Sequence, residues 1–146
     1  MYARPDVCMI AAAMQDRPTY DELLAAVEHF LDAEIVPNAP GARGFHARVA
    51  ANAIRTVRRE LQHEDAQLAA EWTGLDRLLG PSDMPTGREA LRTALRARNE
   101  QLCELIRTGE ADDAAVLDHV RGVVRSKLAV TDPDLLGRSE PSDSRP

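Results

Sequence analysis

Apolar residues recur along this chain every three or four positions, in stretches that begin near helix-capping residues and end near proline or glycine. An α-helix turns once every 3.6 residues, so this spacing places the apolar side chains on one side of a helix. No stretch shows the alternation with a period of two that is typical of a half-buried β-strand. We therefore expect an all-α chain whose helices each bury one side.

The first two helices are the most clearly marked. Thr19 and Glu22 have the spacing of a capping box, and the apolar pattern that follows predicts a helix over residues 20–36. Proline and glycine then interrupt the pattern, and a second amphipathic stretch predicts a helix over residues 44–62.

Three further stretches follow. A weaker pattern over residues 68–79 contains Gly74, which disfavours a helix interior. Thr86 and Glu89 repeat the capping-box spacing before the fourth and longest helix, which ends at Gly109. Asp112 or Asp113 is expected to cap the fifth, which ends before Pro133.

These patterns predict a bundle of four or five mainly antiparallel helices, with the first, second, fourth and fifth helices supplying the core. A length of 146 residues suits one domain. We expect a mobile or loosely docked leader over residues 1–16, the helical bundle over 17–136, and a disordered Pro/Ser-rich tail over 137–146.

Composition narrows the function classes. A net charge of −6 argues against nucleic acid or an anionic membrane as the main partner. Two cysteines without CxxC spacing indicate a reducing cytoplasm, and no apolar stretch approaches the roughly 20 residues of a membrane span. The histidines show no metal-ligand spacing, and neither a nucleophile motif nor a Gly-rich phosphate loop is found, so no cofactor is expected.

Four motifs carry a resemblance to a known family: E-x-x-P at Glu34, F-H-A-R-V-A-A-N over 45–52, an Asn at 99 before L-x-x-x-I-R-x-G over 102–109, and K-L-A-V over 127–130. Residues 17–133 resemble an uncharacterised family of short all-helical bacterial proteins, described only as a domain of unknown function. Genes of such proteins often lie beside kinases similar to aminoglycoside phosphotransferases and beside acyl-CoA dehydrogenases. The resemblance therefore implies one of these enzymes as a protein partner.

Polar residues interrupt the apolar stripes at four positions: Glu34, His46, Arg98 and Lys127. In an up-and-down bundle, three of them would converge at one end, and the long side chain of Arg98 could reach the group. Such charges either pair and fix helix register, or border a cavity that binds an anionic ligand. Asn99 joins this candidate set because Asn is a mediocre helix former that often forms a specific hydrogen bond.

A second group lies on the outward face of the second predicted helix: Arg48, Asn52, Arg55 and Arg59. This stripe is either an ordinary solvated face or a docking surface for an anionic partner or a phosphate.

The sequence favours a non-enzymatic accessory or interaction module that engages a neighbouring enzyme or associates with itself through a helix face. The alternative is a small-molecule binding protein, or a weak enzyme, with a polar pocket for an anionic ligand at one end of the bundle. A lysine-dependent enzyme using Lys127 is a third possibility, which requires a lowered lysine pKa in an apolar pocket.

Overall fold

The computed structural model describes residues 17–138, and the part of the chain that it describes is all α-helical. The predicted leader, and the predicted tail from residue 139 onward, lie outside the described residues. Residues 137 and 138 belong to a short last helix, α5 (Pro133–Arg138), so the predicted tail begins too early. The chain forms two compact units that divide within a single helix, between Arg58 and Arg59. A single bundle domain over 17–136 remains a prediction.

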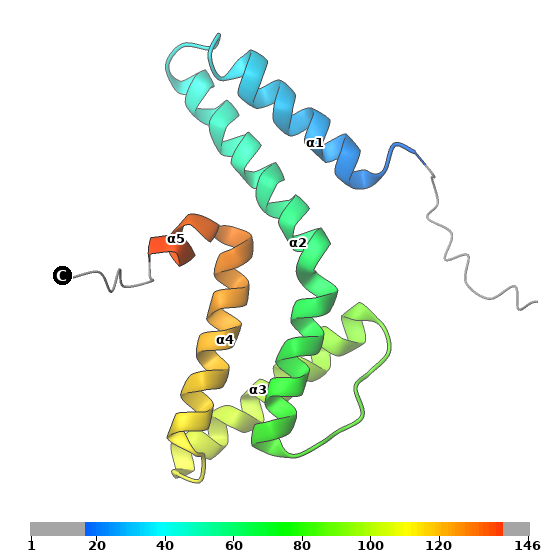
Figure 1. The fold of residues 1–146 in the computed structure, drawn as a ribbon, viewed down its shortest axis with the longest axis vertical. Helices are drawn as coiled ribbons and strands as arrows, with labels where there is room; N and C mark the ends of the chain where they lie inside the picture. The colour runs from blue at the N-terminus through cyan, green and yellow to red at the C-terminus, as the bar shows by residue number, and fades with distance from the viewer. Residues whose placement is uncertain (1–16, 139–146) are drawn as a thin grey trace, which may run out of the picture. The chain divides into compact units, whose positions relative to one another are not determined.

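The first unit is a pair of antiparallel helices. It contains α1 (Tyr20–Phe30), a π-helical continuation (Leu31–Ile35) and the first part of α2 (Ala42–Leu79) (Figure 1). The predicted capping box is confirmed: Thr19 Oγ1 accepts from the Glu22 backbone N–H at 3.2 Å, and Glu22 Oε2 accepts from the Thr19 N–H at 2.8 Å. The first predicted helix is therefore correct in position, with a change of helix type in its last turns.

Small residues on α2 line the buried side of this pair. Gly44, Ala47 and Ala51 are buried at spacings of three and four. A Cβ atom on Gly44 would overlap the backbone carbonyl oxygen of Ala39, so the close return of the chain after α1 requires glycine there. On the other side of this pair, α1 itself contains no buried residue. The prediction that the first helix contributes to the buried core is wrong.

The second unit begins inside α2, which runs unbroken for 38 residues. Separate helices over 44–62 and 68–79 were predicted, and this division is wrong, since residues 63–67 contain neither proline nor glycine. Gly74 lies opposite His119, whose ring would overlap a Cβ atom at this position. The glycine that weakened the helix prediction is thus a place where α4 (Asp113–Thr131) approaches α2 closely.

The hydrophobic core of the second unit is centred on the weakest predicted helix. Trp72 and Leu75 of α2 pack with residues of α3 (Arg88–Thr108). The α3 members of this cluster are Leu91, Leu95 and Leu102. Val116 of α4 packs against the cluster. The prediction that the third stretch stays outside the core is therefore wrong.

Three of the four predicted helix-end signals in this unit are confirmed, and one of them is the end of α4 at Thr131, before Pro133. Gly109 ends α3 in the left-handed conformation with φ 73°. The side chain of Asp112 caps α4 by accepting from the N–H groups of Ala114 and Ala115. The capping box at Thr86 does not form, because α3 begins after Gly87, which has φ 91° and offers no side chain.

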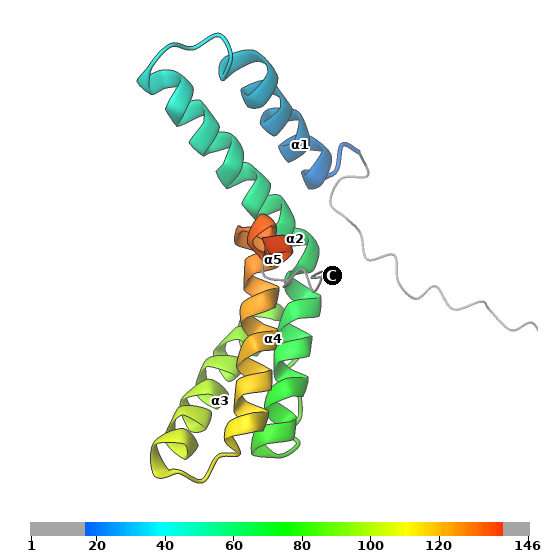
Figure 2. The same ribbon diagram turned by 60° about the vertical axis from the view of Figure 1, so that its left-hand side comes forward.

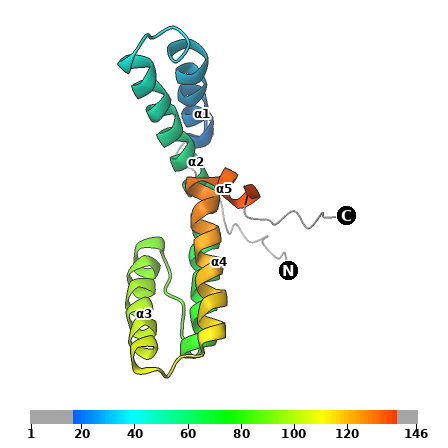
Figure 3. The same cartoon turned by 90° about the vertical axis from the view of Figure 1, so that its left-hand side faces the viewer.

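Contacts between elements give the helix directions. Within the second unit, Arg59 bonds the carbonyl of Val130 and Gln67 that of Ser126, so α2 and α4 are antiparallel. By contrast, α2 and α3 run in the same direction, joined by an extended return over residues 80–87, as Figures 1, 2 and 3 show. This pair is the exception to the predicted antiparallel arrangement. No helix among the described residues is both long and apolar enough to cross a membrane.

Candidate functional site

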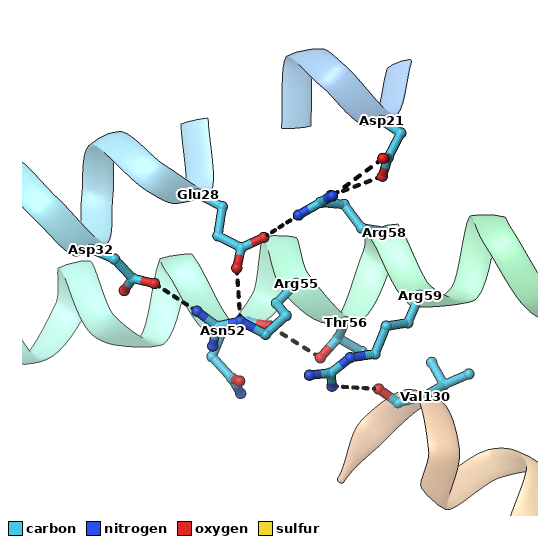
Figure 4. Close-up of polar contacts among 9 residues, drawn as sticks. All are labelled: Asp21, Glu28, Asp32, Asn52, Arg55, Thr56, Arg58, Arg59 and Val130. Atoms are coloured by element: carbon cyan, nitrogen blue, oxygen red, sulfur yellow. Dashed lines mark hydrogen bonds and ion pairs between the residues drawn. The ribbon is translucent and has the colours of Figure 1, made fainter. Parts of the chain in front are cut away.

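Two arginines of α2 are held by three acidic residues, two on α1 and one on its π-helical continuation (Figure 4). Arg55 donates from Nε to Glu28 Oε1 at 2.8 Å and from Nη2 to Asp32 Oδ2 at 2.6 Å. Arg58 donates from Nη1 to Glu28 Oε2 at 2.7 Å and from Nε to Asp21 Oδ1 at 2.8 Å. Glu28 is the centre of the network, because its two carboxylate oxygens each serve a different arginine.

The hydrogen bonds of this network shift the pKa values of Glu28 and Arg58 in opposite directions. Partial burial by itself would raise the pKa of Glu28, but the hydrogen bonds from Arg58 and Arg55 outweigh it and hold that pKa below its ordinary value. Hydrogen bonds to Asp21 and Glu28 raise the pKa of Arg58. Glu28 and Arg58 therefore stay charged at neutral pH, and the network fixes the register of α1 against α2.

This result corrects the predicted outward stripe of α2. Arg55 faces α1 and is neutralised there, and Arg59 donates from Nη1 to the carbonyl oxygen of Val130 at 3.1 Å in the second unit (Figure 4). Both arginines are partly buried. The two residues serve as structural ties, which leaves Arg48 and Asn52 as the exposed members of the predicted set.

Arg48 and Asn52 share their face of α2 with two exposed apolar residues that the sequence analysis did not single out. Phe45 is 60% exposed and Val49 is 51% exposed. Positions 45, 48, 49 and 52 have the i, i+3, i+4, i+7 spacing of one helix face. We call these four residues the α2 docking face.

Arg98 is the one residue of the predicted ligand-binding set that is buried, with 7% of its surface exposed. Its guanidinium forms an ion pair with Asp76, donates from Nη2 to the carbonyl oxygen of Gly80 at 2.8 Å, and lies 4.5 Å from the centre of the Trp72 ring. These contacts satisfy the charge and close the C-terminal end of α2. Arg98 is thus a structural residue of the second unit.

Asn99 is also a structural residue of the second unit. Its side-chain amide donates to Glu71 Oε1 at 2.8 Å, which explains an Asn in the middle of α3. A shallow surface hollow beside Asn99 is lined by residues of α3 alone: Arg96, Asn99, Glu100, Cys103, Glu104 and Arg107. A single helix does not enclose a ligand, so this hollow is not a built binding site.

The side chains of Glu34, His46 and Lys127 are exposed. The three residues do interrupt apolar stripes, but these stripes face outward, so the side chains do not lie in a core. His46 packs edge-on against Phe45, with ring centres 5.6 Å apart. Glu34 and His46 belong to the first unit, and Lys127 to the second. Their convergence and a ligand-binding role remain predictions.

Most of the acidic residues that bind the arginines of the two units were not predicted from the sequence. In the second unit, Asp65 binds Arg88 through two hydrogen bonds of 2.9 and 3.0 Å, and the Arg88 hydrogen bonds lower the pKa of Asp65. Glu64 is buried and forms an ion pair with Arg92. One signal was available for the first unit: Asp21 and Glu28 are seven residues apart on α1, and hence on one helix face.

The fold and the contacts define a class: an all-α protein whose described polar centres tie its helices to one another. Residues 37–135 match the domain of unknown function DUF6285, and the chain belongs to this family. The match includes α2, α3 and α4 and begins after α1, whereas the resemblance noted in the sequence extended from residue 17. Neither the curated proteins nor the solved structures compared with the chain include one that matches it.

Proposed function

We propose that this protein is a non-enzymatic accessory module that binds a neighbouring kinase-like or acyl-CoA dehydrogenase-like enzyme through the α2 docking face. The observation that carries the proposal is the exposure of Phe45 and Val49 beside Arg48 on one helix face. Aromatic side chains and arginine are the residue types that dominate binding energy at protein interfaces.

The charges of this face support a protein partner with an acidic counterpart. Within the described residues, Arg48 forms no ion pair, whereas Arg55 and Arg58 on the same helix are neutralised by α1. An exposed arginine beside apolar side chains suits a carboxylate at the rim of an apolar contact.

The buried polar groups support a structural role over catalysis. Arg98 is satisfied by Asp76, Gly80 and Trp72, and Asn99 by Glu71, so both residues act in helix packing. In enzymes, groups with perturbed pKa values gather at a cleft that admits the substrate. The ligand-binding alternative remains a prediction that rests on Glu34, His46 and Lys127.

Co-expression with the enzyme encoded beside the gene tests the proposal. We expect a complex on size-exclusion chromatography, and we expect Phe45→Glu and Arg48→Glu each to weaken it at least ten-fold, as loss of a central interface contact does. Ile106→Glu on α3 is the matched control, because Ile106 is 46% exposed and lies in the second unit. Circular dichroism checks that each variant keeps its helix content.

Two results would contradict the proposal. One is separate elution of both candidate enzymes from this protein at micromolar concentration. The other is a complex that survives Phe45→Glu and Arg48→Glu unchanged, since binding would then use a different surface.

A further inference from the structure

The helix pair of the first unit leaves a row of large apolar side chains uncovered. Tyr20, Leu23, Val27 and Phe30 of α1 are each about half exposed, from 47% to 56%. They follow one another at spacings of three, four and three residues and so form one stripe of the helix, which we call the α1 stripe. Because α1 contains no buried residue, the pair by itself does not bury this stripe.

Val57 of α2 is a further exposed apolar residue of this unit, with 44% of its surface exposed. Ala51 is fully buried on the side of α2 that faces α1. Val57 lies six residues after Ala51, and Phe45 lies six residues before it. A step of about 100° per residue therefore places Val57 and Phe45 on opposite flanks of the helix, each about 120° from Ala51.

The α1 stripe and Val57 lie on the same side of the pair. Glu28 marks the side of α1 that faces α2, because it binds two arginines there. Viewed from the N-terminus of each helix, the stripe is displaced counter-clockwise from Glu28, and Val57 is displaced counter-clockwise from Ala51. In antiparallel helices, displacement in the same sense leads to the same side. We call this surface the hairpin face; it consists of Tyr20, Leu23, Val27, Phe30 and Val57.

The charged and titratable residues on this side lie at the edges of the hairpin face. Glu34, Arg43 and His46 are near the turn between the two helices, and Glu60 follows Val57 along α2. The α1 stripe itself is interrupted by no charge between its first and last residue. The centre of the face therefore suits an apolar surface of another protein better than a charged ligand.

The α1 stripe is complementary to itself. Read in either direction, it has an aromatic residue at each end and two aliphatic residues between, at intervals of three, four and three. Two such stripes packed antiparallel bring Tyr20 of one copy opposite Phe30 of the other, and Leu23 opposite Val27. A two-fold dimer requires a surface of this kind, because each contact occurs twice with the roles exchanged.

We propose that the hairpin face is the contact between two copies of this protein. The two α1 helices pack antiparallel, and α2 of each copy adds its Val57 beside them, so that two hairpins form one four-helix arrangement. Every residue of the contact belongs to the first unit. The α2 docking face with Phe45 is on the opposite side of the pair, so self-association does not compete with enzyme binding.

The exposed area is sufficient for a weak, specific dimer. With about 100 Å² for each half-exposed aromatic side chain and somewhat less for each aliphatic one, two hairpin faces bring together roughly 800 Å² of apolar surface. Apolar atoms make up about two-thirds of homodimer interfaces, so the complete contact covers on the order of 1,200 Å². This area is at the lower end of the range for specific interfaces.

Two matched valine substitutions test the contact. Sedimentation velocity should show the wild-type protein as a dimer at micromolar concentration, and the dimer should persist at about 0.5 M salt, where charge contacts are screened. Val27→Glu should raise the dissociation constant at least about ten-fold, because it places a charge in the apolar contact. Val49→Glu is the control: Val49 is 51% exposed, belongs to the same unit and lies on the α2 docking face, so the dimer should be unchanged.

Disulfide crosslinking tests the antiparallel orientation. In a background with Cys8→Ser and Cys103→Ser, an equimolar mixture of the Leu23→Cys and Val27→Cys proteins should give a disulfide-linked dimer under mild oxidation. Neither variant should give it alone, because position 23 of one copy faces position 27 of the other. Circular dichroism checks that every variant keeps its helix content.

Four results would overturn the proposal. The first is a wild-type protein that stays monomeric up to about 100 µM, well above the micromolar range of such pairs. The second is a dimer that Val27→Glu weakens no more than Val49→Glu does. The third is crosslinking that is no stronger in the mixture than in its components. The last is a monomeric protein whose enzyme complex is lost on Val27→Glu, which would assign the hairpin face to the enzyme. Absence of an enzyme complex leaves the sedimentation and crosslinking results unaffected.

Discussion

The carboxylate of Glu28 accepts a 2.7 Å hydrogen bond from the guanidinium of Arg58, across the pair formed by α1 and α2. Glu28 is 14% exposed and also accepts from Arg55. Glu28→Gln should therefore lower the free energy of unfolding by about 1.5–2 kcal/mol, the lower part of the range for hydrogen bonds to charged groups. Urea denaturation followed by circular dichroism measures this loss. Asp32→Asn is the comparison variant and should cost less, because Asp32 is more exposed and bonds only Arg55.

The same residue should make stability depend on pH in acid. The pKa of Glu28 is lowered from 4.5 in the folded protein, so the unfolded chain binds this proton more tightly. The contribution of Glu28 is therefore fully present above pH 4.5 and is lost as pH falls through the folded pKa. The stability difference between wild type and Glu28→Gln should shrink on acidification, as urea titrations at several pH values would show. A constant difference down to pH 2 would contradict the assigned role.

Arg98 should be the most sensitive charged residue of the second unit. Arg98→Met leaves Asp76 without its partner and removes the cation from the Trp72 ring, at a cost of roughly 2–4 kcal/mol, given that Asp76 remains partly exposed. Arg98→Lys should not recover this loss, because one ammonium group cannot reproduce the fork that binds both Asp76 and the Gly80 carbonyl. Thermal unfolding measures both variants. Lys127→Met is the control and should change stability by less than about 0.5 kcal/mol, because Lys127 is exposed.

Gly74 gives a prediction in which two effects oppose one another. Alanine would favour the helix by up to about 1 kcal/mol, but its Cβ atom would overlap the His119 ring, and overpacking costs about 1–3 kcal/mol. Gly74→Ala should therefore destabilise the protein. In a His119→Ala background the clash is gone, so the same substitution should stabilise it. Denaturation of all four proteins tests the sign change, and destabilisation of equal size in both backgrounds would contradict the explanation.

The periodicity of the sequence was enough to predict the helices but not which helices pack against one another. The all-α class, the Thr19 cap, the Gly109 end and the Asp112 cap depend on neighbouring residues, and all were predictable. The continuity of α2 was missed because two apolar patterns, over 44–62 and 68–79, were interpreted as two helices, whereas they are parts of one helix with different neighbours. An apolar stripe does not say whether it faces a core or solvent, which is why Glu34 and Lys127 were expected to be buried. Arg98 was correctly placed inside, but Asp76 as its partner depends on α3 running in the same direction as α2.

The dependence of Arg55 and Arg58 on α1 affects how this protein can be dissected. A fragment that starts at residue 37, where the family match begins, keeps both arginines and removes Asp21, Glu28 and Asp32. Arg55 and Arg58, together with Arg43 and Arg48, would then make residues 42–59 of α2 a cationic segment that contains no acidic residue. The protein as a whole is acidic. Such a fragment would adhere to nucleic acid, heparin resins and anionic vesicles through charge alone. Binding assays made with this fragment would report contacts of arginines that α1 covers in the intact protein. The protein used to search for ligands should therefore include α1.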